Sequence, residues 1–145
     1  MTQPAWQRKA REFLPELLPK DRSATSLHDF ALDLFGAVKA ANPPADLFAR
    51  VFDFINYCLN PARAESVKVD VVEGFVRHAL ADGRFRREVQ ERLFANSETV
   101  LQYAPDRMPE EAFVVFKELV RNDPRWNRVQ AGERSGRAER SSDSN

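Results

Sequence analysis

The sequence predicts an all-α protein, a compact array of about six antiparallel helices arranged as a bundle or as stacked helical hairpins. Two observations support this fold class. Apolar residues recur at helical spacing through most of the 145-residue chain, and nine prolines fall mostly between these apolar segments. Because proline cannot continue a helix but suits its first turn, the prolines divide the chain into helix-sized pieces.

The first three predicted helices follow these prolines. The first covers residues 4–18 and is kinked or shortened at Pro15. The second begins after Ser26, a favourable N-cap residue, and the third begins near Pro44 with Asp46 in its first turn. The second and third helices each carry an apolar stripe that is typical of a buried face. The stripes are Leu27, Phe30, Ala31, Leu34 and Val38 in the second helix, and Leu47, Val51, Phe54, Ile55 and Cys58 in the third.

The fourth segment, residues 64–82, allows two interpretations. Residues 67–71 alternate between apolar and polar side chains as a strand does, and β-branched residues favour strands. Helical spacing nevertheless continues through Phe75 and Ala79, and the sequence offers no second convincing strand for pairing. We therefore expect a helix that ends before Gly83.

Two further helices complete the predicted array. The fifth covers residues 85–95, a short continuation covers Glu98–Tyr103, and the sixth begins at Pro109. We expect the sixth helix to end at Pro124, after which Trp126 folds back over the core.

The composition fits one domain, residues 1–130, followed by a disordered tail, residues 131–145. The tail has no aromatic or large aliphatic residue with which to form a core. The whole chain is 43% hydrophobic and 30% charged, as is typical of globular proteins.

The apolar runs of the chain are far shorter than the ~20 residues of a membrane helix, and no signal peptide is evident. We expect a cytoplasmic protein without a membrane partner.

The charged and metal-ligating residues argue against several function classes. The chain has 22 basic and 22 acidic residues, whereas a dedicated nucleic-acid binder usually has a basic excess. One cysteine and two histidines leave little material for a disulfide or a metal cluster. Five glycines form no phosphate-binding loop. We therefore expect no cofactor, no metal and no nucleic-acid partner.

The candidate catalytic residues are few. Cys58 lies on an apolar stripe near the end of a helix, where nothing lowers the pKa of its thiol, so we expect a buried structural cysteine. His28 and Asp29, together with His78, suggest a metal-dependent hydrolase, but this set is short of ligands and the hydrolase stays a remote alternative. We expect His78 to pair with Asp82 at i+4, and we predict no catalytic residue.

Acidic residues are concentrated in one part of the chain. Residues 25–73 carry four basic and seven acidic side chains, a balance of −3. One interpretation is an acidic face that binds a basic protein surface, and the other is an ordinary solvated face. We also expect Glu73 to pair with Arg77 at i+4. The candidate partner-binding residues are Asp29, Asp33, Asp46, Asp53, Asp70 and Glu73.

Four short segments occur together in a familiar order. They are FLPEL at 13–17, LHDF at 27–30, FDFI at 52–55 and VKVDVVEGF at 67–75. The combination resembles a group of small all-helical bacterial domains, some of which look like immunity proteins that accompany secreted toxins. The resemblance covers roughly residues 10–120 and consists of helix stripes rather than a catalytic signature. It implies a non-enzymatic, cytoplasmic protein that neutralises a cognate toxin by binding it.

Together these features predict a protein-binding module that is not an enzyme. In the immunity-like form of this hypothesis, a rigid helical surface covers the active site of a basic partner, and acidic residues speed association. The alternative is a helical adaptor or self-associating scaffold. Apolar residues on more than one face of the third and fourth helices would then form a homodimer interface.

Overall fold

The computed structural model describes residues 4–18, 26–40 and 44–126, and every regular element within these ranges is a helix. The predicted all-α fold class is confirmed. The described residues form eight α-helices, one π-helix and one 3₁₀-helix, more than the six helices expected, because predicted helices are subdivided. The α-helices are α1 (Ala5–Phe13), α2 (Leu27–Lys39), α3 (Ala45–Leu59), α4 (Glu65–Val71), α5 (Arg77–Ala81), α6 (Arg86–Arg92), α7 (Ser97–Tyr103) and α8 (Glu110–Arg121).

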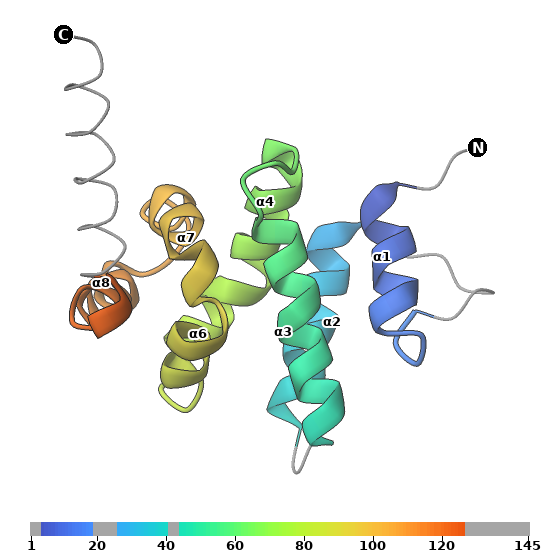
Figure 1. Ribbon diagram of the computed structural model, residues 1–145, viewed down its shortest axis with the longest axis horizontal. Coiled ribbons are helices and arrows are strands. Elements are labelled where there is room, and N and C mark those ends of the chain that lie inside the picture. The colour runs from blue at the N-terminus through green and yellow to red at the C-terminus, as the bar shows by residue number, and fades with distance from the viewer. Residues whose placement is uncertain (1–3, 19–25, 41–43, 127–145) are drawn as a thin grey trace, which may run out of the picture.

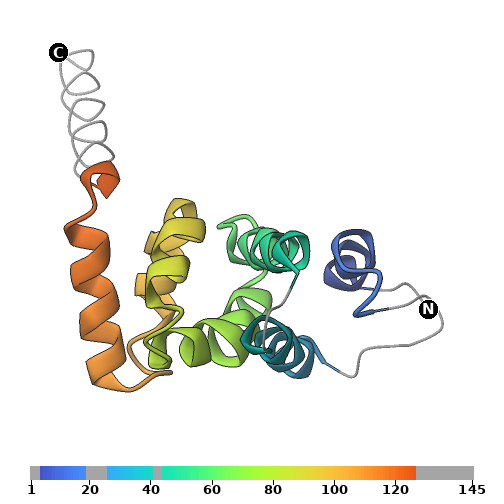
Figure 2. The same ribbon diagram turned by 90° about the horizontal axis from the view of Figure 1, so that it is seen from below.

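The helices lie side by side in an extended row (Figure 1). Helix α1 forms one end of the row and α8 forms the other, and the view from below shows the same order (Figure 2). Helix α3 packs against α1, α2 and α4, whereas α8 packs against α5 and α6. Neighbours along the chain are therefore largely neighbours in space, as in stacked helical hairpins.

The predicted helix boundaries in the first half of the chain are close to the observed ones. Helix α1 ends at Phe13, so Pro15 shortens the helix rather than kinking it. The Oγ atom of Ser26 accepts a hydrogen bond from the backbone N–H of Asp29 at 3.1 Å, which caps α2 as expected. Prolines 4, 44 and 109 immediately precede α1, α3 and α8. These prolines therefore determine where three of the helices begin.

The ambiguous fourth segment is helical from end to end. Helix α4 continues into a π-helix, Val72–Val76, which continues into α5. All the π-helical residues except Glu73 are buried. The helix ends at Ala81, before Gly83 as predicted. The strand alternative is therefore not adopted. Val71 of the alternating segment is buried, and Val67 and Val69 pack against the core while partly exposed.

The predicted fifth helix is divided into shorter elements. Helix α6 ends at Arg92, a 3₁₀-helix covers Phe94–Asn96, and α7 follows directly. The division occurs at Leu93, a fully buried residue that anchors the turn between the two α-helices. Trp126 is half-buried and packs against the core, as expected for a residue that folds back after α8.

Aromatic rings connect the helices through the core. Phe30 of α2 contacts Phe54 of α3 edge-on, with 5.7 Å between ring centroids. Phe52 of α3 contacts Phe75 of the π-helix in the same manner at 5.4 Å. The apolar stripes of α3 are thus buried within the chain itself. Val114, which is 44% exposed, is the one large hydrophobic side chain on the surface of the described residues.

Two expectations concern the ends and the environment of the chain. The disordered tail expected at residues 131–145, like the end of the 1–130 domain, lies outside the described residues. Within the described part of the chain, none of the helices combines the length and apolar character required to cross a membrane.

Candidate functional site

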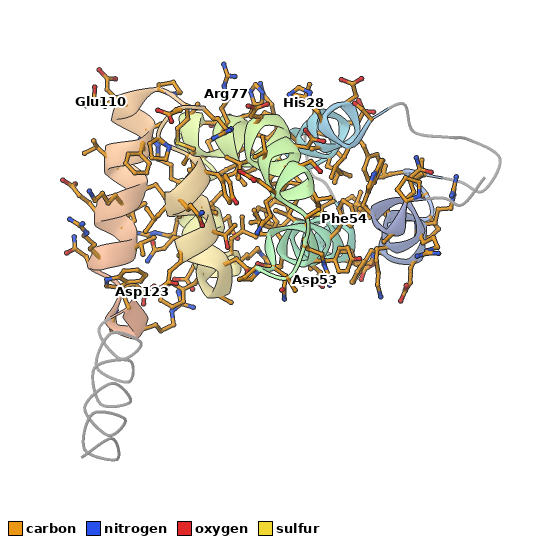
Figure 3. The ribbon with its side chains drawn as sticks, turned by 90° about the horizontal axis from the view of Figure 1, so that it is seen from above. His28, Asp53, Phe54, Arg77, Glu110 and Asp123 are labelled. Atoms are coloured by element: carbon orange, nitrogen blue, oxygen red, sulfur yellow. The ribbon has the colours of Figure 1, made fainter. Side chains whose placement is uncertain are left out.

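A cluster of charged side chains lies where α2 meets the π-helix. We call it the His28 face and define it as His28, Asp29, Asp70, Glu73 and Arg77. The Nδ1 atom of His28 is 3.7 Å from Oδ1 of Asp29, and the charges of His28 and Glu73 both act on the pKa of Asp70. His28 and Arg77 lie on the same edge of the molecule (Figure 3). The fold therefore brings together Asp29, Asp70 and Glu73, three of the six candidate binding residues.

Close packing between the π-helix and α2 holds this face in place. A Cβ atom on Gly74 would lie 2.7 Å from the carbonyl oxygen of His28 and 2.8 Å from the Cβ atom of Ala31. Only glycine permits this approach without a shift of one helix. Gly74 is therefore the residue that allows α2 to lie directly against the π-helix, beside Asp70 and Glu73.

Asp70 is the least compensated carboxylate of the cluster. Its side chain is partly buried, and within the described residues it has no hydrogen bond or ion pair. Burial raises the pKa of Asp70 above its ordinary value, the positive charge of His28 opposes this change, and the negative charge of Glu73 adds to it. A partly buried carboxylate without a partner favours the approach of a cation.

Glu73 has a different partner from the one that the sequence predicted. Its Oε1 atom lies 3.2 Å from Nε of Arg107, in the turn after α7, rather than pairing with Arg77. Arg107 also donates a hydrogen bond from Nη1 to the carbonyl oxygen of Tyr103 at 3.0 Å. The expected i, i+4 pair was wrong because the π-helix changes the angular position of side chains across this turn. Arg77 remains exposed and projects outward (Figure 3).

The other three candidate binding residues differ in their surroundings. The carboxylate of Asp46 accepts a hydrogen bond from Nε of Arg50 at 2.9 Å. The same guanidinium donates hydrogen bonds to Glu16 and lowers the pKa of that carboxyl, which ties the turn after α1 to α3. Asp33 is exposed one helical turn along α2 from Asp29. Asp53 lies on the edge of the molecule opposite His28 (Figure 3). The six acidic candidates therefore do not all lie on one face, because Asp53 on α3 and His28 on α2 occupy opposite edges (Figure 3).

The two histidines interact electrostatically but are not part of a metal-binding group. The charge of His28 acts on His78, whose pKa is lowered mainly by burial and further by Arg77 and His28. The His78 ring lies against Phe35, with 5.7 Å between ring centroids. Its expected partner Asp82 bonds to Arg84 instead, at 2.9 Å. No group of three His, Cys, Asp or Glu side chains that could hold a metal ion is found in residues 4–18, 26–40 and 44–126.

Cys58 is fully buried in the core of α3, and burial raises the pKa of its thiol to about 12. A thiol with this pKa is almost entirely protonated at neutral pH and is a poor nucleophile. The structural role that the sequence indicated for Cys58 fits its position.

Sequence reasoning missed two residues of the site. Gly74 interrupts an apolar helical segment, and an isolated glycine in such a segment often marks close helix packing, so a signal was present. Arg107 lies in the turn after α7 and gave no signal, because its contact with Glu73 spans 34 positions. Comparison of the chain with protein-family models, with curated proteins and with solved structures finds no match.

Proposed function

We propose that this chain is a protein-binding module whose His28 face receives a basic surface of another protein. The observation that carries the proposal is that Asp70, a partly buried carboxylate, has no hydrogen bond or ion pair within the described residues and is opposed only by the charge of His28. A lysine or arginine from a partner would supply the missing counter-charge in a site that is already partly desolvated. Charge-assisted pairs of this kind are stronger than exposed ones.

The surroundings of Asp70 support recognition by a rigid surface. Gly74 fixes the π-helix against α2, and the pair of Glu73 with Arg107 fixes the turn after α7. Groups on packed helices are held more accurately than groups on loops, which reduces the entropy lost on binding. Exposed Arg77 lies on the same edge of the molecule as His28 and adds an outward positive charge (Figure 3), so a partner that carries a carboxylate as well as a cation would be favoured.

The immunity-like mechanism is the specific form of this proposal. In it, the cytoplasmic chain covers the active site or substrate groove of a basic toxin and acts without catalysis. The resemblance of residues 10–120 to immunity-like helical domains supports this form, together with the position of Asp70 on the surface. The scaffold alternative depended on apolar stripes of α3 and α4, and those residues are largely packed inside the chain.

Affinity capture from the organism that encodes the chain tests the proposal. The tagged full-length chain is used at low and at moderate salt. We expect one basic protein that is released as salt rises, is toxic when expressed alone, and is neutralised by co-expression of this chain. Recovery of only the chain itself, or of a complex that is indifferent to salt, would contradict the proposal and favour the scaffold.

A further inference from the structure

His28 is a member of the His28 face whose charge can change near neutral pH. Its side chain is 39% exposed, and its Nδ1 atom lies 3.7 Å from Oδ1 of Asp29. At Gly74 the π-helix lies close against the backbone of His28, and the side chains of His28 and Asp70 interact electrostatically. Imidazole groups ordinarily gain a proton, and with it a positive charge, as the pH falls from 8 to 5. The face can therefore gain a positive charge beside two carboxylates in mildly acidic solution.

The groups around His28 are mainly acidic and come from four elements. They are Asp29 from α2, Asp70 from α4, Glu73 from the π-helix, and Arg77 and His78 from α5. The carboxylate of Glu73 already pairs with Arg107. Helix α3 also packs against α2, but its Asp53 lies on the opposite edge (Figure 3). Asp29 and Asp70 are therefore the carboxylates on which a charge at His28 acts most directly.

A protonated His28 would compete with a basic partner for Asp70. The imidazolium supplies part of the counter-charge that a lysine or arginine of the partner would otherwise supply, and it also repels that cation. Both effects act at short range, so salt at physiological concentration screens them only in part. A neutral His28 leaves the charge of Asp70 without this compensation. The face therefore attracts a cation more strongly when His28 is neutral.

The second histidine, His78, has different surroundings. Its ring lies against Phe35, with 5.7 Å between ring centroids. Burial lowers the pKa of His78, and the charges of Arg77 and His28 lower it further. His78 therefore gains its proton at more acidic pH than an ordinary histidine and provides a matched control for His28.

We propose that His28 is a pH-sensitive switch of the His28 face, which accepts a basic partner when His28 is neutral and disfavours it when His28 is protonated. The inference rests on the proposed function, because it concerns the binding of a basic partner to the same face. It adds that the affinity for that partner rises with pH through the range in which an imidazole loses its proton.

Binding of N-acetylated pentalysine to the full chain tests the switch. Lysine side chains stay protonated throughout this range, so the charge of the peptide does not change with pH. The dissociation constant is measured by chemical-shift titration of the ¹⁵N-labelled chain at about pH 5.5 and about pH 7.5. We expect two- to fivefold tighter binding at the higher pH, roughly the range for one exposed charge interaction, with the largest shifts at the His28 face.

Two substitutions of His28 should have opposite effects. His28→Gln is neutral at both pH values, so it should bind pentalysine with the higher affinity at both. His28→Lys is charged at both, so it should bind with the lower affinity at both. His78→Gln should keep the pH dependence of the unchanged chain. Misfolding would weaken binding by either His28 variant, so it cannot produce the predicted pair of results.

Two results would overturn the switch while the binding face stands. They are equal affinities at the two pH values, or a pH dependence that survives in His28→Gln, provided that Asp70→Asn still weakens pentalysine binding at the higher pH. Loss of the pH dependence in His78→Gln would assign the titration to the wrong histidine and would also overturn it. If Asp70→Asn binds pentalysine like the unchanged chain, the proposed function itself is contradicted, and the switch with it.

Discussion

The position that a Cβ atom would occupy on Gly74 lies 2.7 Å from the carbonyl oxygen of His28. A side chain on residue 74 would therefore lie closer to α2 than ordinary packing allows. Glycine, which has no Cβ atom, lets the π-helix and α2 approach this closely. The charged groups of the His28 face lie on both sides of this contact. The separation of the two helices therefore sets the spacing of the charges that we propose a partner recognises.

Replacing Gly74 by alanine is expected to destabilise the fold by about 1–3 kcal/mol, because a methyl group would be forced against backbone atoms. Gly36→Ala is the matched control, since the space around a Cβ on Gly36 is open and α2 is helical there. It should be neutral or stabilise by up to about 1 kcal/mol. Urea unfolding of both variants measures the difference, and equal free energies of unfolding would refute the close-packing argument.

The ion pair between Glu73 and Arg107 should contribute modestly to stability. Both side chains are about one-third exposed, so a double-mutant cycle with Glu73→Gln and Arg107→Gln should give a coupling energy of up to about 1 kcal/mol. The corresponding cycle for Glu73 and Arg77 should give a value within about 0.3 kcal/mol of zero. A larger coupling to Arg77 than to Arg107 would show that the pairing described for the π-helix is incorrect.

Asp123 is expected to make stability depend on pH in the acid range. Hydrogen bonds from Arg125 hold the pKa of this buried carboxyl far below its ordinary value of 3.8. The stabilisation is fully present above that ordinary value, and it is lost as the pH falls because the unfolded chain takes up a proton more readily. Asp123→Asn should lower stability at pH 7 and flatten the decline toward acid pH, whereas exposed Asp33→Asn should change neither. Identical pH profiles for Asp123→Asn and the unchanged protein would oppose this account.

Asp70 is expected to have the opposite effect on stability. Its folded pKa is raised above 3.8 by burial, so the ionised carboxylate destabilises the fold at neutral pH and this penalty disappears in acid. Asp70→Asn should therefore raise the melting temperature by about 1–3 °C at pH 7 and leave it unchanged near pH 3. A clear loss of stability at pH 7 would indicate that Asp70 has a structural role that its surroundings do not reveal.

Helix positions were predictable from this sequence because the signals are local. Ser26 caps its own helix, and Pro15 limits a helix that lies directly before it. The division near Leu93 was missed because that residue keeps the helical spacing while its backbone turns to bury the side chain. The π-helix was missed because its buried valines and Phe75 also fit an ordinary helix stripe.

The candidate site was only partly predictable because it depends on how the helices rotate against one another. Asp70 and Glu73 belong to one helical segment, and their nearness follows from sequence spacing alone. The distance of Asp53 from His28, and the pairing of Glu73 with Arg107, follow from packing between helices far apart in the chain. Counting charges along the sequence does not show how the helices rotate, and so it does not show which charged residues meet in the fold.

The most direct test of the proposed function compares how the Asp70→Asn and Asp53→Asn variants bind the basic protein captured by the unchanged chain. Each substitution removes one negative charge, but only Asp70 belongs to the His28 face. We predict that Asp70→Asn weakens binding at least about tenfold and reduces its salt dependence, whereas Asp53→Asn binds like the unchanged chain. Equal affinities for the two variants, or a greater loss for Asp53→Asn, would contradict binding through the His28 face.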